Sequence, residues 1–262
     1  MGKEATKYLK EDPFKIIEEG LHLDRLKVSE SIFSLANEYT GIRGSFDEGS
    51  DSLDSLRGSY FNGIYEYAKK DTPSAYLGIV KRTHFMINSV DWTKVKIVCL
   101  NQKLDLGKVK FSKFYRELDM QSGLYTRSFT WKVTEGKHID ICFKRLLSMT
   151  ECHKVFQVIT LKTNFDCKVD LELSLNSNVL HWGQDCYWDR KDEFVTDENI
   201  YALRVNTQTT NQKLVSSAHG STLLRRYAKG GATSKGQQRQ TDSCKSSNFK
   251  RTGTDIERRS GV

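Results

Sequence analysis

The clearest candidate for chemistry is the ten-residue stretch HWGQDCYWDR, which spans residues 181–190. It places three aromatic side chains, Trp182, Tyr187 and Trp188, among acidic and amide side chains. A sugar ring has an apolar face and a rim of hydroxyls, so aromatic rings with nearby carboxylates and amides suit it. We therefore treat Trp182, Tyr187 and Trp188 as candidate carbohydrate-binding residues. The alternative is that the two tryptophans fill one end of the hydrophobic core.

A group of four carboxylates overlaps this stretch: Asp185, Asp189, Asp192 and Glu193. Two carboxylic acids can cleave a glycosidic bond when one is protonated and the other ionised, although an acidic surface segment has the same composition. The motifs GxSxG, HExxH, GxxxxGK[ST] and GxGxxG are all missing from the sequence. No two of the six cysteines stand at CxxC spacing and the six histidines are scattered, so the sequence predicts no metal site.

The positive charge of the chain is concentrated at its C-terminal end. The formal net charge is +8, and residues 216–262 hold ten Lys or Arg against three Asp or Glu. The rest of the chain is therefore nearly neutral, which makes nucleic acid an unlikely partner of the folded part. Of the last 47 residues, 23 are Gly, Ser, Thr, Gln or Asn, too polar a composition to bury a core. We predict a folded domain over residues 1–215 and a basic, disordered tail over residues 216–262.

The sequence gives no sign of a membrane partner. The first ten residues, MGKEATKYLK, lack the apolar region of a signal peptide. No apolar run approaches the ~18 residues that a membrane-spanning helix needs. Without CxxC spacing, the cysteines are most simply free thiols in a reducing compartment. We therefore expect a cytoplasmic protein.

Apolar and polar residues alternate through much of residues 75–205, which predicts strands. The segments 94–100, 124–133, 138–144 and 164–175 each have one apolar face, and Arg127 interrupts that face in the second. Residues 155–162 are apolar on both faces, as expected of a more central strand. Turn residues separate these segments roughly every ten residues, which favours an antiparallel sandwich.

The stretch ESIFSLANEYTGIRGSF, residues 30–46, breaks this pattern. Four residues recur there at helical spacing: Ile32, Leu35, Ala36 and Tyr39. The spacing predicts a short helix, capped by Ser29 or Ser31 and ended by Gly41. Gly41 and Gly44 flank Arg43, and glycines at these positions allow a close turn or a tightly packed strand that holds the guanidinium in place.

Several blocks of the sequence, in collinear order over residues 14–215, resemble the N-terminal domain of glycoside hydrolase family 65, which includes maltose, kojibiose, nigerose and trehalose phosphorylases. The blocks are ESIFSLANEYTGIRGSFDEG (30–49), GSYFNGIYE (58–66), INSVDWTKVKI (87–97), FYRELDMQSGLYTRSFTW (114–131), KRLLSMTECH (144–153) and VLHWGQDCYW (179–188). The resemblance implies an all-β fold, a large two-sheet antiparallel super-sandwich. It also implies that residues 30–46 are mostly extended chain with a glycine turn, which we expect for residues 41–46, while residues 32–39 stay open between this and the helix. It further implies a domain-facing role for Arg43, Tyr60, Asn62 and Tyr65, with a structural role as the alternative for Arg43.

Members of the family continue into a helical (α/α)6 barrel that carries the active site, where a glutamic acid protonates the leaving group and inorganic phosphate attacks as co-substrate. That acid lies in a Pro-Asp-Glu context, whereas Pro13 and Pro73 precede Phe14 and Ser74. The resemblance thus implies a truncated, non-catalytic N-terminal domain with no catalytic residue and no cofactor. Its expected partners are a separate barrel or a second copy of the chain, and an α-linked disaccharide. The alternative is a free-standing carbohydrate-binding module.

Overall fold

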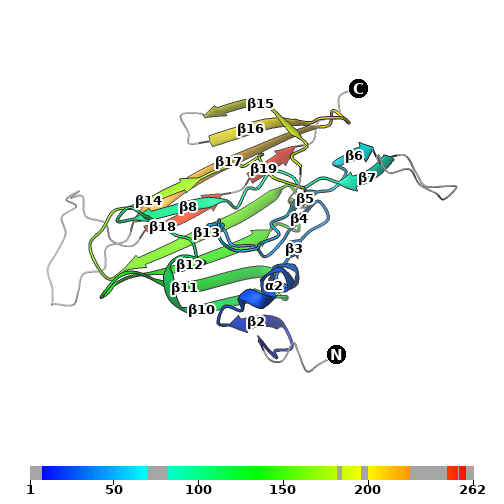
Figure 1. The fold of residues 1–262 in the computed structure, drawn as a ribbon. Coiled ribbons are helices and arrows are strands. Elements are labelled where there is room, and N and C mark those ends of the chain that lie inside the picture. The colour runs from blue at the N-terminus through cyan, green and yellow to red at the C-terminus, as the bar shows by residue number, and fades with distance from the viewer. Residues whose placement is uncertain are drawn as a thin grey trace.

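The fold is an antiparallel β-sandwich in which one large sheet carries a layer of smaller sheets on one face (Figure 1). A computed structural model of the chain describes residues 8–69, 82–181, 185–195, 200–224, 247–252 and 254–257. The predicted all-β antiparallel class is confirmed. The second layer, however, consists of separate small sheets.

As far as the chain is described, the large sheet has eleven strands. Ten of them follow one spatial order: β1 (Leu9–Lys10), β2 (Lys15–Glu19), β10 (Lys110–Asp119), β11 (Leu124–Thr134), β12 (Lys137–Leu147), β13 (Lys154–Thr163), β18 (Ser247–Thr252), β17 (Lys213–Leu224), β16 (Ile200–Thr207) and β15 (Trp188–Val195). The eleventh, β19 (Thr254–Glu257), pairs with β13 and β17. The segment expected to be a central strand, residues 155–162, lies within β13, which has neighbours on both sides.

The second layer contains two three-stranded sheets. Their strands are β3 (Leu35–Ala36), β4 (Thr40–Ile42) and β5 (Ser59–Phe61) in one, and β14 (Val169–Leu173), β8 (Val95–Cys99) and β9 (Gln102–Lys103) in the other. A hairpin of β6 (Tyr65–Lys69) and β7 (Arg82–Met86) extends from one end, and the short helices η1 (Leu23–Arg25) and α2 (Leu26–Ile32) lie over β10 and β11 (Figure 1).

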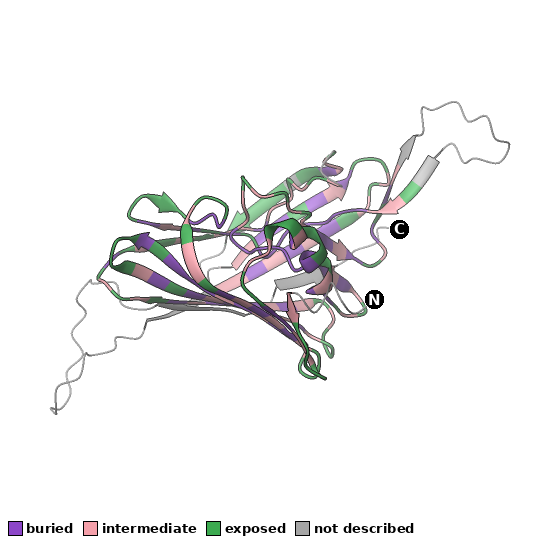
Figure 2. Ribbon diagram, turned by 60° about the horizontal axis from the view of Figure 1, so that its bottom comes forward, coloured by how far each residue is buried: buried purple, intermediate pink, exposed green. Residues whose placement is uncertain are grey.

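The hydrophobic core fills the space between the two layers. Tyr125, Phe129 and Trp131 alternate along β11 and point to the same buried face. Tyr125 packs with residues of the β3–β4–β5 sheet, whereas Trp131 packs in a second cluster with Ile97 of β8. Figure 2 shows the buried positions running along the strands where the layers meet. Both small sheets therefore cover one face of the large sheet.

A row of buried polar side chains crosses this core, one from each of five adjacent strands: Glu18, Arg116, Arg127, Arg145 and Gln157. Strand register places Glu18 opposite Arg116, Arg116 opposite Arg127, and Arg145 opposite Gln157. Between β11 and β12 the row steps by two residues, because Arg145 lies opposite Tyr125. The interruption that Arg127 makes in an apolar face thus marks a buried charge. We call these five residues the polar row.

The connection between β4 and β5, residues 43–58, places two carboxylates against the polar row. Arg127 donates hydrogen bonds to Glu48 Oε1 at 2.8 Å and to Asp47 Oδ2 at 3.0 Å. Arg145 and Gln157 both donate to Asp47 Oδ1, at 2.8 and 2.6 Å. The aligned charges therefore attach an irregular segment of the second layer to the large sheet.

The Asp47 contacts predict a loss of stability in acid. Burial opposes ionisation of Asp47, but Arg145 and Arg127, with the hydrogen bonds from Arg145 and Gln157, lower its pKa from 3.8 to about 2. Because the folded-state pKa is depressed, this stabilisation is complete above about pH 4 and is lost as the pH falls towards 2. We expect the free energy of unfolding to fall by about 2 kcal/mol over that window from this group alone. Urea unfolding followed by circular dichroism at pH 6, 4 and 2.5 measures it, and a constant midpoint would contradict the prediction.

The helix predicted from Ile32 to Tyr39 is wrong in position. The chain is helical over Leu26–Ile32, so the extended chain that the resemblance implied from residue 30 begins later than expected. It is already extended at Leu35–Ala36, as the resemblance implied there. The cause is a competing hydrogen bond, since the Gly44 N–H donates to the Glu30 carbonyl at 2.7 Å. In a continuing α-helix, the Ser34 N–H would donate to the Glu30 carbonyl. Here it donates to the Ser31 carbonyl instead. Ser29 and Ser31 lie inside the helix, and Gly41 lies in β4.

The sequence-based division at residue 215 falls inside a strand. β17 spans Lys213–Leu224, and its pairing with β16 continues to His219. Ser216 and Ala218 are buried beyond the division, because alternate positions of β17 face the core. Residues 225–246, 253 and 258–262, the larger part of the predicted tail, lie outside the described residues.

Candidate functional site

In the described part of the chain, a cleft opens at the seam between the two three-stranded sheets of the second layer. Its volume is about 560 Å³, within the range of small-molecule sites. Three connections form its walls: residues 43–58, 87–94 and 174–180. Strand residues of both sheets complete it, among them Ile42 and Ser59 on one side and Val95 and Lys96 on the other. We call it the seam cleft.

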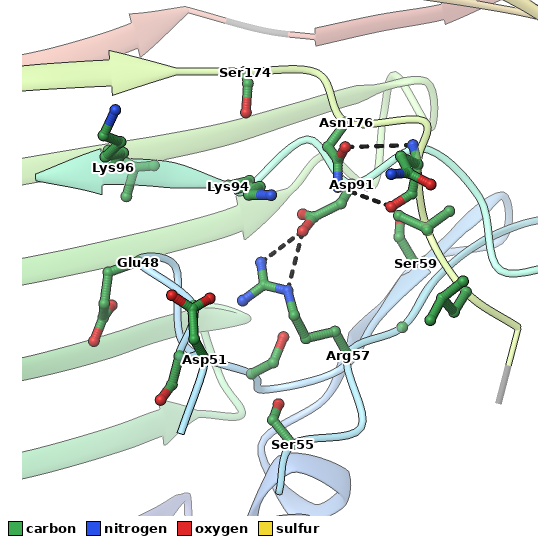
Figure 3. Close-up of a pocket in the computed structure, with 18 of the residues that line it drawn as sticks. Glu48, Asp51, Ser55, Arg57, Ser59, Asp91, Lys94, Lys96, Ser174 and Asn176 are labelled. Atoms are coloured by element: carbon green, nitrogen blue, oxygen red, sulfur yellow. Dashed lines mark hydrogen bonds and ion pairs between the residues drawn. The ribbon is translucent and has the colours of Figure 1, made fainter. Parts of the chain in front are cut away.

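An ion pair between Arg57 and Asp91 spans the seam cleft. Arg57 donates to Asp91 Oδ2 from Nε at 3.1 Å and from Nη2 at 2.6 Å, and its Nη1 donates to the Phe46 carbonyl. Thr93 donates to the other oxygen, Asp91 Oδ1, through its backbone N–H at 3.0 Å and its hydroxyl at 2.8 Å. Figure 3 shows the Arg57 guanidinium reaching from the 43–58 connection to Asp91. The pair thus fixes two walls of the cleft relative to each other.

Asn88 joins the third wall to the other two. Its Oδ1 accepts the Ser59 N–H at 2.9 Å, and its Nδ2 donates to the carbonyls of Arg57 at 3.3 Å and Leu180 at 3.0 Å. A backbone bridge between Asp91 and Asn176 adds two hydrogen bonds, of 2.9 and 3.0 Å. Irregular chain is therefore held in place by a few amides and one ion pair.

Two aspartates of the seam cleft, Asp91 and Asp51, are suited to binding and unsuited to proton donation. Burial opposes ionisation of Asp91, but Arg57 and the hydrogen bonds from Arg57 and Thr93 hold its pKa below the usual value. The hydrogen bond from Lys103 lowers the pKa of Asp51. A general acid at neutral pH needs a raised pKa, so both groups stay ionised as hydrogen-bond acceptors.

Comparisons with known proteins identify the family. Residues 16–252 match the family model described as glycosyl hydrolase family 65, N-terminal domain.

The chain belongs to this family.

Its relatives by sequence include an alpha,alpha-trehalose phosphorylase and a kojibiose phosphorylase of Thermoanaerobacter brockii, 31% identical over 154 residues and 28% over 153. Each alignment covers 58% of this chain, but only 20% and 18% of those proteins. A solved structure named "Putative kojibiose phosphorylase from human microbiome" is 44% identical with a TM-score of 0.80, covering 95% of this chain and 33% of its own. The chain therefore spans about a fifth of the curated relatives and a third of the solved one.

The three aromatic residues proposed for carbohydrate binding do not form one exposed platform in this family 65 domain. Trp188 is only 6% exposed, belongs to the core, and donates from Nε1 to the Asn88 carbonyl at 2.8 Å. It thus takes the core position that the sequence analysis kept as its alternative. Tyr187 packs edge-on against Phe85, with ring centroids 5.2 Å apart. Trp182 lies outside the described residues, and its role and that of Tyr187 stay predictions.

Two of the four neighbouring carboxylates, Asp192 and Glu193, are paired with cations on β15 and β16. Arg190 forms an ion pair with Glu193, and Arg204 forms one with Asp192. These contacts are typical of a solvated strand edge.

Of the four residues expected to face a neighbouring domain, Tyr60 lies in β5 and Tyr65 begins β6, whereas Arg43 directly follows β4 and Asn62 directly follows β5. None of the four lines the seam cleft. Arg43 is half-buried and donates from Nη2 to the Lys27 carbonyl at 3.1 Å and to Ser31 Oγ at 2.8 Å. Tyr60 is half-buried, whereas Asn62 and Tyr65 are exposed. Arg43 therefore helps to hold α2 in place, and a domain-facing role of the four stays a prediction.

Sequence reasoning did not single out the residues that build the seam cleft, namely Arg57, Ser59, Asn88, Asp91 and Lys94. Four of them lie within the blocks that carry the family resemblance, GSYFNGIYE and INSVDWTKVKI, and the fifth, Arg57, lies directly before one. Their position in or beside these blocks was the sequence signal that could have identified them. Within the described part of the chain, no group of three or more His, Cys, Asp or Glu side chains could hold a metal ion. The helices described there are too short and too polar to cross a membrane.

Proposed function

We propose that this chain is a non-catalytic β-sandwich domain that works beside the (α/α)6 barrel of a family 65 enzyme acting on α-linked glucose disaccharides. The observation that carries the proposal is the family match over residues 16–252. The relatives named as kojibiose and trehalose phosphorylases are several times longer than the region they share with this chain. On this proposal, their reaction uses residues outside the region shared with this chain. Inorganic phosphate is then a co-substrate of the whole enzyme.

The chemistry of the seam cleft supports a non-catalytic role. The two aspartates with lowered pKa values, Asp51 and Asp91, each lie against a cation. Neither provides the protonated carboxyl that glycosidic cleavage requires. The Pro-Asp-Glu context is missing from the sequence as well. The barrel is thus the proposed partner, supplied by another polypeptide or by further chain, and a homo-oligomer is the alternative arrangement.

A phosphorolysis assay tests the proposal. We expect the chain, incubated with kojibiose, nigerose, maltose or trehalose and inorganic phosphate, to release no glucose 1-phosphate above the buffer control. A coupled phosphoglucomutase assay detects that product, and a full-length kojibiose phosphorylase serves as the positive control. Turnover that scales with the concentration of the chain would refute the non-catalytic role.

We also propose that the protein works in the cytoplasm. The support is the state of its thiols, since Cys142, Cys152 and Cys186 are free cysteines in the described part of the chain. Free thiols persist in reducing compartments.

A further inference from the structure

The charges that line the seam cleft are almost completely paired. Lys96 contacts Glu172 at 3.0 Å and Lys103 contacts Asp51 at 2.8 Å. Arg57 is paired with Asp91 as described, and the buried carboxylate of Glu48 is paired with Arg127 of the polar row. Figure 3 shows lysines along β8 on one side and Asp51 and Glu48 on the other. These pairs neutralise each of the four carboxylates that line the cleft, so that most of the lining carries no net charge for an ionic ligand to meet.

Hydrogen-bonding capacity nevertheless remains in the seam cleft. Ser59 is 2% exposed, and its Oγ has no hydrogen-bond partner among the described residues. A buried hydroxyl without a partner carries a desolvation cost that a bound ligand can remove. Lys94 is exposed and forms no ion pair with any residue that the structure describes. Asn176 and Asn178 add amides on the opposite wall.

Apolar side chains lie between these polar groups. Ile42, Val95, Val179 and Leu180 all line the seam cleft. A neutral sugar matches this combination, because its C–H face covers apolar side chains while each hydroxyl both donates and accepts. The volume of about 560 Å³ also suits a small ligand.

We propose that the seam cleft binds a neutral mono- or disaccharide, with Lys94 and Ser59 as ligand-contacting residues. This goes beyond the proposed function, since it places a sugar site on the β-sandwich itself. It also places that site apart from the aromatic candidate Tyr187, which does not line the cleft. A chain that binds sugar but releases no glucose 1-phosphate satisfies both proposals. A chain that does neither refutes only this one.

Saturation-transfer NMR of the full chain with millimolar glucose, kojibiose or trehalose tests the site. We expect saturable binding of at least one sugar. Because hydrogen bonds to charged groups contribute most, Lys94→Ala should weaken binding at least about tenfold, and Ser59→Ala by about two- to tenfold. Lys168→Ala is the matched control, because Lys168 is an exposed lysine that contacts Asp170 outside the cleft. It should bind like the unmodified chain.

Three results would overturn the proposal. The first is a flat titration with all three sugars. The second is unchanged binding in Lys94→Ala together with loss of binding in Tyr187→Ala, which would move the site to the aromatic residues. The third is tighter binding of inorganic phosphate than of any sugar, with an affinity that falls as salt is added, because that behaviour identifies an anion site.

Discussion

Replacing Asp47 with asparagine is expected to destabilise the domain by about 3–5 kcal/mol, the usual cost of breaking a buried ion pair by removing one partner. Asp47 is fully buried and neutralises two fully buried guanidiniums, with Arg145 Nε at 2.8 Å and Arg127 Nη2 at 3.0 Å. An asparagine fits the space but leaves Arg145 without a counter-charge and Arg127 with Glu48 alone. A loss of this size is a large fraction of the stability of a typical domain. Urea unfolding at pH 7 measures it.

A surface aspartate with the same ion-pair distance provides the control. Lys168 contacts Asp170 at 2.8 Å, but both side chains are largely exposed, at 85% and 61%. Because water screens such a pair, Asp170→Asn should change the free energy of unfolding by no more than about 1 kcal/mol. If Asp47→Asn and Asp170→Asn cost the same, burial is not what makes the polar row important, and the account of how the 43–58 connection is attached would fail.

The strands were predictable because their signal is local. Along β11 and β12 every second side chain faces the core, so periodicity alone located both strands and gave the all-β class. The same pattern exposed Arg127 as a polar residue on an apolar face. Its partners could not be read from the sequence, because Asp47 and Glu48 lie about eighty residues away and meet it only through the fold.

The seam cleft was not predictable for a related reason. Its walls are connections without periodicity, and Arg57, Asn88 and Leu180 become neighbours only when the two small sheets pack on the large one. The aromatic stretch attracted attention because tryptophan and carboxylates together suit sugars. Burial then decided the outcome for Trp188, which fills the core beside Asn88.

The misplaced helix has the same origin. Apolar spacing from Ile32 to Tyr39 fits a helix, but the periodicity carries no information about a distant N–H that competes for the Glu30 carbonyl. That competitor is Gly44, which can approach only because it has no side chain. The two glycines around Arg43 therefore have different roles, although they look equivalent in the sequence.

Replacing Gly44 with alanine is expected to destabilise the domain by about 1–3 kcal/mol, the usual range for forcing extra atoms into a packed core. A Cβ at Gly44 would lie 2.7 Å from both Cβ and the carbonyl oxygen of Phe33. Phe33 is itself buried and packs against Tyr125, so its backbone cannot move aside without disturbing the core. The Gly44–Glu30 hydrogen bond that ends α2 would be lost with the shift.

Gly41→Ala is the matched control, because it makes the same chemical change three residues earlier. A Cβ at Gly41 would meet only the Ala36 Cβ, at 3.9 Å, an ordinary van der Waals contact. We expect its free energy of unfolding to stay within about 0.5 kcal/mol of the unmodified chain, or to rise slightly, since alanine restricts the unfolded chain. Urea unfolding of the two variants side by side measures the difference. Equal stabilities would show that the close approach at Gly44 does not hold α2, and the explanation for where that helix ends would have to be abandoned.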